Sequence, residues 1–207
     1  MTRDEEMNAV LRAQNGDPQA FELLVLTNQK HVYNLALKMV NNEDDALDIA
    51  QDVFLRAYTA IGGFRGDSRF SVWLFRLTSN ICIDFLRQRQ RRRTGSLTYM
   101  DEDDQPEELE IPDERFTPER EFERREMNLA ISRALSELPP ALREIVILRE
   151  INGLSYEEIG EVMSLEVGTV KSRLFRARKK LCLLLLEDGN ISVPVASYNK
   201  RGGVRNA

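Results

Sequence analysis

The sequence predicts an all-α protein with two small domains, a helical bundle and a helix-turn-helix, joined by an acidic flexible linker. Apolar residues recur at helical spacing between the loops, and the alternation typical of β-strands is scarce. Residues 101–126 carry 13 acidic and 4 basic side chains, three prolines and no sustained apolar period, which is typical of an extended linker. We expect domains at 1–95 and 127–187, the linker at 96–126 and a loose tail at 188–207.

The formal net charge of −5 argues by itself against a basic protein that coats DNA. The distribution of charge along the chain removes this objection. Residues 65–100 carry 8 basic and 2 acidic groups, and residues 127–207 carry 12 basic and 9 acidic groups. The acidic excess lies in residues 1–64 and 101–126. Two basic regions separated by an acidic one are compatible with a nucleic-acid partner.

The two cysteines, Cys82 and Cys182, lie far apart and outside any CxxC or Cys/His spacing, so we expect no disulfide framework or zinc module. Both are expected to be buried apolar side chains, with a redox role left open. The longest apolar run, residues 181–186, is far shorter than the roughly 20 residues that span a bilayer. The first residues lack the apolar core of a signal peptide. We therefore expect a cytoplasmic protein without membrane insertion.

Two helices are expected in the first half of the chain. One begins near Pro18, a residue that suits a first helical turn, and ends at Asn41-Asn42. The next runs from about Asp44 to Ile61. The apolar residues that we expect on their buried sides are Phe21, Leu24, Val25, Val32, Leu35, Ala36 and Met39 in the first, and Ala46, Ile49, Ala50, Val53, Phe54, Ala57, Tyr58 and Ile61 in the second.

The opposite side of the second helix carries Asp48, Gln51, Asp52 and Leu55, which share one face at the spacing i, i+3, i+4, i+7. This face is either a solvated surface or a docking surface for a basic partner. An apolar residue on a polar face, here Leu55, slightly favours docking.

A glycine-rich loop at 62–70 and a basic helix at about 71–90 follow. The loop interleaves phenylalanines with arginines, which either fills the core or binds single-stranded nucleic acid, where stacking contributes roughly 1–3 kcal/mol per base. Membrane-surface binding by the helix is the weaker alternative, because its non-basic side is bulky and resembles core. That side holds Phe70, Trp73, Leu74, Leu77, Ile81 and Phe85, and the other stripe holds Arg76, Asn80, Asp84, Arg87 and Arg91.

Residues 138–181 predict a helix-turn-helix. Pro139-Pro140 opens a helix that Asn152-Gly153 ends, because these residues tolerate left-handed backbone. Ser155 and Glu158 form a capping box for the next short helix. A turn near Ser164 then leads to the last helix.

The last helix, from about Val167, has the pattern of a recognition helix. An ordinary helical hairpin with a basic face is the alternative, but caps, turn, packing stripe and charge all agree on a DNA-binding motif. We expect Val170, Leu174, Ala177 and Leu181 to be buried, and Lys171, Arg173, Arg176, Arg178, Lys179 and Lys180 to be exposed.

These residues resemble the extracytoplasmic-function group of bacterial RNA polymerase sigma factors, which are small two-domain members of the sigma-70 family. The resemblance covers roughly residues 7–186. Glu166 departs from it, because many members have proline there. The matching stretches are ALDIAQDVF at 46–54, FRGDSRF at 64–70 with Trp73, Leu74 and Asn80, GLSYEEI at 153–159 and GTVKSRLFRAR at 168–178.

The resemblance implies a specificity subunit that binds the RNA polymerase core and directs transcription initiation, without a catalytic site or cofactor of its own. The implied partners are the β′ clamp and β flap of the core, duplex DNA at the −35 element, single-stranded DNA at the −10 element and an anti-sigma factor. The implied core-binding residues are Asp48, Gln51, Asp52 and Leu55; those for the −10 element are Phe64, Arg65, Asp67, Ser68, Phe70, Trp73, Arg76, Asn80, Asp84, Arg87 and Arg91; those for the −35 element are Thr169, Lys171, Ser172, Arg173, Phe175, Arg176 and Arg178.

Two other functions are compatible with parts of the sequence. A helix-turn-helix regulator that does not bind polymerase stably would leave the Asp48 face and the 62–70 loop unexplained. An enzyme is disfavoured because the chain has one histidine, His31, and neither a phosphate-binding GxxxxGK[ST] loop nor an HExxH motif. The acidic cluster at 101–104 is expected to be solvated linker and not a metal site.

Overall fold

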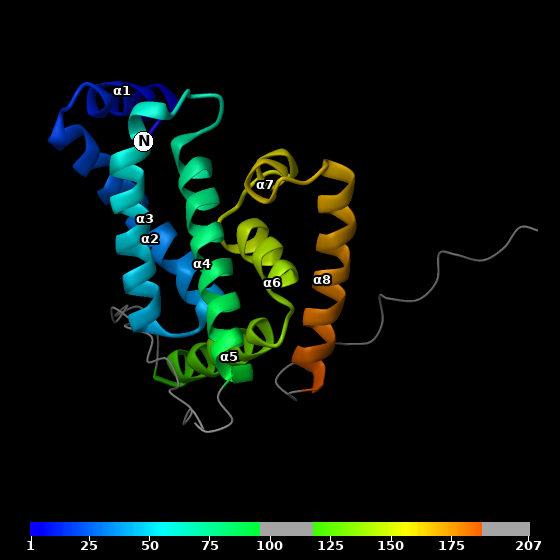
Figure 1. Cartoon of the computed structure of the whole chain (residues 1–207). Helices are drawn as coiled ribbons and strands as arrows, with labels where there is room; N and C mark the ends of the chain where they lie inside the picture. Colours follow the sequence, from blue (N-terminus) through cyan, green and yellow to red (C-terminus); the bar gives the residue numbers. More distant parts are fainter. Residues whose placement is uncertain (96–117, 188–207) are drawn as a thin grey trace, which may run out of the picture.

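The computed structural model describes residues 1–95 and 118–187, and throughout these residues the regular elements are helical (Figure 1). This confirms the all-α prediction. The first half contains α1 (Arg3–Gln14), α2 (Pro18–Val40), α3 (Glu43–Ala60), the short 3-10 turn η1 (Ile61–Gly63) and α4 (Phe70–Gly95). The second half contains α5 (Pro118–Ser136), α6 (Pro140–Val146), the π-helical segment η2 (Ile147–Ile151), α7 (Tyr156–Met163) and α8 (Val167–Glu187).

Short polar side chains set the helix ends in the first half. The Asp17 carboxylate accepts hydrogen bonds from the backbone amides of Gln19 and Ala20, directly before α2. Asn41 ends α2 with a left-handed φ of 56°, and the Asn42 side chain caps α3. The predicted break at Asn41-Asn42 is therefore confirmed, and it separates two long helices with almost no loop.

Helix α4 is buried on two sides, whereas the sequence predicted one. On the predicted side, Phe70 and Leu74 are buried, whereas Trp73, Leu77, Ile81 and Phe85 are half-buried against the core. A second stripe, buried throughout, consists of Val72, Phe75, Ser79 and Cys82. The reason is tertiary: α4 packs against α2 and α3 on one side and against α7 on the other (Figure 1). The buried side chains of both halves form one continuous core.

Two adjacent charged residues of α6, Arg143 and Glu144, are buried where the two halves of the chain meet. The Arg143 guanidinium donates hydrogen bonds to the backbone carbonyls of Met39 in α2 and of Ser136 and Leu138. Burial raises the pKa of the adjacent Glu144, and the nearby Ser79 hydroxyl and Arg173 charge oppose this only in part. Arg143 thus joins the two halves through the backbone of α2.

The predicted linker range 96–126 extends into a helix, because α5 begins at Pro118. Proline suits the first turn, and the glutamates and arginines that follow have high helix propensity. Lys38 in α2 donates a hydrogen bond of 2.9 Å from its Nζ to the Ser132 hydroxyl in α5. Residues 96–117 and the predicted tail at 188–207 lie outside the described residues.

Cys82 is buried as expected, but Cys182 is exposed on α8. Burial, together with the nearby charge of Glu144, raises the pKa of the Cys82 thiol to about 12. Within residues 1–95 and 118–187, no helix is both long and apolar enough to cross a membrane.

Candidate functional site

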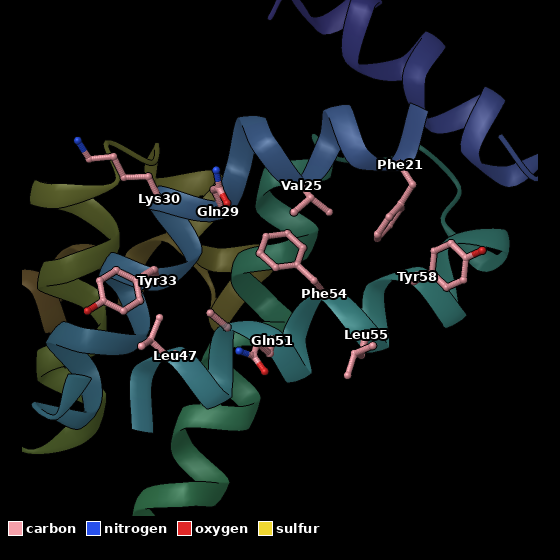
Figure 2. A pocket seen from close by; sticks show the side chains of 11 residues that line it. Phe21, Val25, Gln29, Lys30, Tyr33, Leu47, Gln51, Phe54, Leu55 and Tyr58 are labelled. Carbon is pink, nitrogen blue, oxygen red and sulfur yellow. The ribbon is translucent and has the colours of Figure 1, made fainter. Parts of the chain in front are cut away.

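An exposed apolar groove runs between α2 and α3 (Figure 2). It encloses a volume of about 760 Å³. Leu55 is 68% exposed and Tyr58 57% exposed, and the Tyr58 ring packs edge-on against Phe21 at a centroid distance of 5.0 Å. The lining side chains are Phe21, Val25, Gln29, Lys30 and Tyr33 from α2, and Leu47, Ala50, Gln51, Phe54, Leu55 and Tyr58 from α3.

Two of the four predicted docking residues line this groove, and the other two lie elsewhere on α3. Gln51 and Leu55 line it directly, and Asp48 is exposed on the same helix. The Asp52 carboxylate is bound within the chain, because Arg56 one turn later lies 2.8 Å away. The polar face and the groove together make a mixed surface of acidic and large apolar side chains.

The sequence missed the α2 wall of the groove. Phe21, Val25, Ala50 and Phe54 were expected in the core but are half-buried. The prediction that Tyr58 is buried is wrong. The sequence did contain a sign of the groove. Apolar residues recur at 50, 54 and 58, beside the α3 stripe that packs in the core. An apolar arc wider than one packing face indicates a second, unpartnered surface.

The 62–70 loop and the start of α4 hold a cluster of aromatic rings. Phe64, Phe70 and Trp73 contact one another with centroid distances between 5.3 and 5.7 Å. Phe70 is 1% exposed, so its ring supports the cluster from within the core. Its burial disfavours the predicted contact of Phe70 with DNA, whereas Phe64 and Trp73 are only half-buried.

Helix α1 holds this loop in place. The Gln14 side-chain amide donates hydrogen bonds of 2.8 Å to the carbonyls of both Ile61 and Phe64. The Glu6 carboxylate accepts a hydrogen bond from the backbone amide of Phe70, at the start of α4. These supports were not predicted, because nothing in the local sequence connects α1 to a loop about fifty residues later.

The loop also needs glycine at one position. Gly66 has a φ of +76°, and a Cβ added there would lie 2.6 Å from the terminal methyl carbon of Met7. The left-handed backbone is what favours glycine here, because the flexible end of the Met7 side chain could move aside for a Cβ.

The predicted basic stripe of α4 is exposed along its length. Asp84 and Arg87 form a loose ion pair of 3.4 Å on it. Where the stripe meets the loop, a cavity of about 400 Å³ opens between the two halves of the chain. The exposed residues of the stripe are Arg76, Asn80, Asp84, Arg87 and Arg91. The residues that line the cavity are Gly63, Phe64, Arg65, Asp67, Ser68, Trp73, Arg76 and Glu161.

The helix-turn-helix is formed as predicted. The Ser155 hydroxyl accepts a hydrogen bond from the Glu158 amide, and the Glu158 carboxylate accepts one from the Ser155 amide. The turn places Ser164 in left-handed backbone with a φ of 54°. A Cβ at Gly160 would lie 2.7 Å from the Leu165 carbonyl oxygen, so glycine permits the tight approach of the turn to α7.

The outer face of α8 is basic. Lys171, Ser172, Phe175 and Arg176 are exposed. Arg178 is partly engaged within the chain, because its Nε lies 2.9 Å from the Glu150 carboxylate. Of the residues predicted to be buried, Val170, Leu174 and Ala177 face the core and Leu181 is half-buried. Thr169 is half-buried, as is Arg173, which was predicted to be exposed.

No group of three or more potential metal ligands occurs among the residues that the structure describes. The acidic cluster at 101–104 lies outside them.

Comparisons with known proteins agree with these features. Residues 24–92 match the model of sigma-70 region 2, and residues 128–181 match the model of sigma-70, region 4. The RNA polymerase sigma-H factor of Pseudomonas aeruginosa is 39% identical over 181 residues, covering 87% of this chain and 94% of that protein. The ECF RNA polymerase sigma-E factor of Escherichia coli K12 is 39% identical over 172 residues, covering 83% and 90%.

Two solved structures share the fold. CnrH in complex with the cytosolic domain of CnrY has a TM-score of 0.66 at 28% identity and covers 89% of this chain and 99% of that one. The sigma factor RpoE in complex with the anti-sigma factor NepR from Bartonella quintana has a TM-score of 0.63 at 26% identity and covers 81% and 98%. The chain therefore belongs to the extracytoplasmic-function sigma factors of the sigma-70 family, whose regions 2 and 4 bind the RNA polymerase core and promoter DNA.

Proposed function

We propose that this sigma factor docks on the polymerase core through the α2–α3 groove and contacts promoters with two separate surfaces, one in each half of the chain. The observation that carries the proposal is the groove itself, since a concave surface lined largely by apolar side chains, with Leu47, Leu55 and Tyr58 exposed, is typical of an interaction site. The assigned core-binding residues are Asp48, Gln51, Asp52 and Leu55, extended by the groove residues Phe21, Tyr33 and Tyr58.

The outer face of α8 is assigned to duplex DNA at the −35 element. A protruding helix with exposed arginines and a short polar start can enter the major groove and hydrogen-bond base edges. Lys171, Ser172, Phe175 and Arg176 have the exposure that base contacts need. Thr169, Arg173 and Arg178 are assigned to supporting contacts, with Arg178 exchanging Glu150 for a phosphate.

The 64–69 loop and the outer stripe of α4 are assigned to the −10 element. A base taken out of the duplex stack needs a pocket, because unstacking costs a few kcal/mol that pocket contacts must offset. The cavity lined by Phe64, Arg65, Asp67, Ser68, Trp73 and Arg76 combines rings, arginines and small polar groups. The stripe Asn80, Asp84, Arg87 and Arg91 continues it along the path of the strand.

The remaining expectations follow from the relatives. CnrH is in complex with the cytosolic domain of CnrY, and RpoE is in complex with the anti-sigma factor NepR. We therefore assign an anti-sigma factor to this chain as a partner. The sigma factors among its relatives are polymerase subunits, and we assign this chain no catalytic site of its own. The cytoplasm, where polymerase and promoter DNA meet, is the assigned location, and the anti-sigma partner is the assigned route by which the chain would be held at the membrane.

The docking assignment is tested with Leu55→Lys. The variant should lose the free energy of burying the Leu55 side chain against the polymerase, about 1.5–3 kcal/mol. The affinity for the core polymerase should therefore fall roughly tenfold to a hundredfold. Leu11→Lys is the matched control, because Leu11 is 52% exposed on α1 and lies outside the groove. Fluorescence anisotropy of the labelled chain titrated with core polymerase measures both. Equal affinities for the two variants would refute the assignment.

A further inference from the structure

We propose that the acidic face of α7, formed by Glu158 and Glu161, docks on the −10 surface within the same chain and competes there with single-stranded DNA. The proposal rests on the assignment of that surface to the −10 element. Figure 1 shows α7 beside the first turns of α4, next to the loop that precedes it. An element of the −35 half thus covers the DNA-binding end of the −10 half.

The first contact is an ion pair between residues 89 positions apart in the sequence. The Arg69 guanidinium donates from Nε at 2.9 Å and lies 2.6 Å from the same Glu158 oxygen through Nη2. Partial burial raises the pKa of Glu158, but hydrogen bonds from the Ser155 amide and Arg69 outweigh it and leave that pKa below its ordinary value. Glu158 is therefore a carboxylate at neutral pH, placed on an arginine of the loop.

The second contact is one turn further along α7. Glu161 follows Glu158 by three residues and shares its face of the helix. It lines the 400 Å³ cavity together with Arg65, Trp73 and Arg76. Its side chain therefore closes one side of the cavity assigned to a flipped base and places a negative charge where the phosphate of that base would approach.

Glu158 and Glu161 lie beside the three arginines Arg65, Arg69 and Arg76. Their carboxylates bring to this surface the negative charge that a phosphate backbone would bring. The docked α7 holds Arg69 and repels phosphate at the cavity wall, so DNA binding should favour a state in which α7 has moved away. The contacts are partly exposed to solvent, and exposed ion pairs are weak, so each carboxylate should shift the equilibrium by about twofold to fivefold. A partner that binds only the open form, such as core polymerase held at the α2–α3 groove, can then release the −10 surface.

Three single variants on α7 test the proposal with matched changes of charge. Glu158→Gln and Glu161→Gln remove the two docking carboxylates, and glutamine at 158 can still complete the capping box. Glu157→Gln is the control, because Glu157 is exposed on the same helix and lies outside the cavity. The probe is a fluorescein-labelled single-stranded oligonucleotide of random sequence, titrated with the full chain in the absence of polymerase. We expect each docking variant to bind it about twofold to fivefold more tightly than the control.

A second measurement reports the contact without DNA. Arg69→Lys places a primary amine opposite Glu158, and a carbodiimide should join the two side chains in an amide that peptide mass spectrometry identifies. The cross-link should form in the free chain and decrease when core polymerase is added. Absence of the cross-link in the free chain, or equal DNA affinities for all three α7 variants, would overturn the proposal.

A transcription assay separates this proposal from the assigned function. With core polymerase present, all three α7 variants should still initiate transcription, because none of their side chains is assigned to the core or to DNA. If the unmodified chain fails to support initiation with core polymerase, the assigned function fails. If it succeeds but the docking variants match the control in DNA affinity, only the docking proposal fails.

Discussion

Replacing Gln14 with glutamate should impair promoter melting while leaving polymerase binding intact. The Gln14 amide donates two hydrogen bonds of 2.8 Å, to the carbonyls of Ile61 and Phe64. Glutamate has nearly the same shape but no N–H group, so both bonds are lost and a carboxylate faces two carbonyl oxygens. The loop that carries Phe64 then loses its attachment to α1.

The size of the effect follows from the half-buried setting of Gln14. Leaving a buried acceptor unpaired costs about 1–3 kcal/mol, and water that reaches a half-buried site recovers part of this. We therefore expect the substitution to destabilise the ordered loop by about 1–2 kcal/mol. This corresponds to a factor of about 5–30 in the equilibrium constant between the ordered and the detached loop.

The assay is permanganate reactivity of unpaired thymines around the −10 element, using holoenzyme assembled on a promoter that this sigma factor uses. We expect the open-complex equilibrium to fall by about 5–30-fold for Gln14→Glu, with unchanged anisotropy in core binding. Asn8→Asp is the matched control, since Asn8 is exposed on the same helix and undergoes the same amide-to-acid change. Gln14→Lys should recover part of the effect because lysine restores an N–H donor. Equal melting by Gln14→Glu and Asn8→Asp would refute the reasoning, as would a parallel loss of core binding.

Three further outcomes are expected. Arg176→Ala should relax preference at one −35 position by about 1–3 kcal/mol, provided the lost contact is bidentate, and leave −10 preference unchanged; transcription from a promoter library measures this. Glu144→Gln should raise the melting temperature at pH 7–8. Burial raises the Glu144 pKa, so the native state holds its proton more tightly and stability falls as pH rises above the ordinary value of 4.5. The increase in melting temperature should shrink as the pH falls toward 4.5. Thermal melts of both proteins between pH 4.5 and 8 test this. In the native chain a thiol reagent should label Cys182 rapidly and Cys82 only after denaturation, because burial removes the reactive thiolate.

The local features of the fold could be predicted because short-range chemistry determines them. Asn41 and the Ser155–Glu158 pair act on backbone groups within a few residues, so their effect is independent of the rest of the molecule. The exposed stripe from Arg76 to Arg91 and the basic face of α8 follow from helical periodicity in the same way. These elements also carry the family pattern, so the class of protein was determined by sequence as well.

Tertiary structure decided which neighbour covers each apolar face. Periodicity places Phe70 and Tyr58 alike on an inward side, but one lies in the core and the other stands on an open groove. The Gln14 bonds to the loop and the contact between Arg69 and Glu158 join positions 47 to 89 residues apart. Local patterns specify the direction of a side chain along its own helix, and only the packing of helices specifies what it meets there.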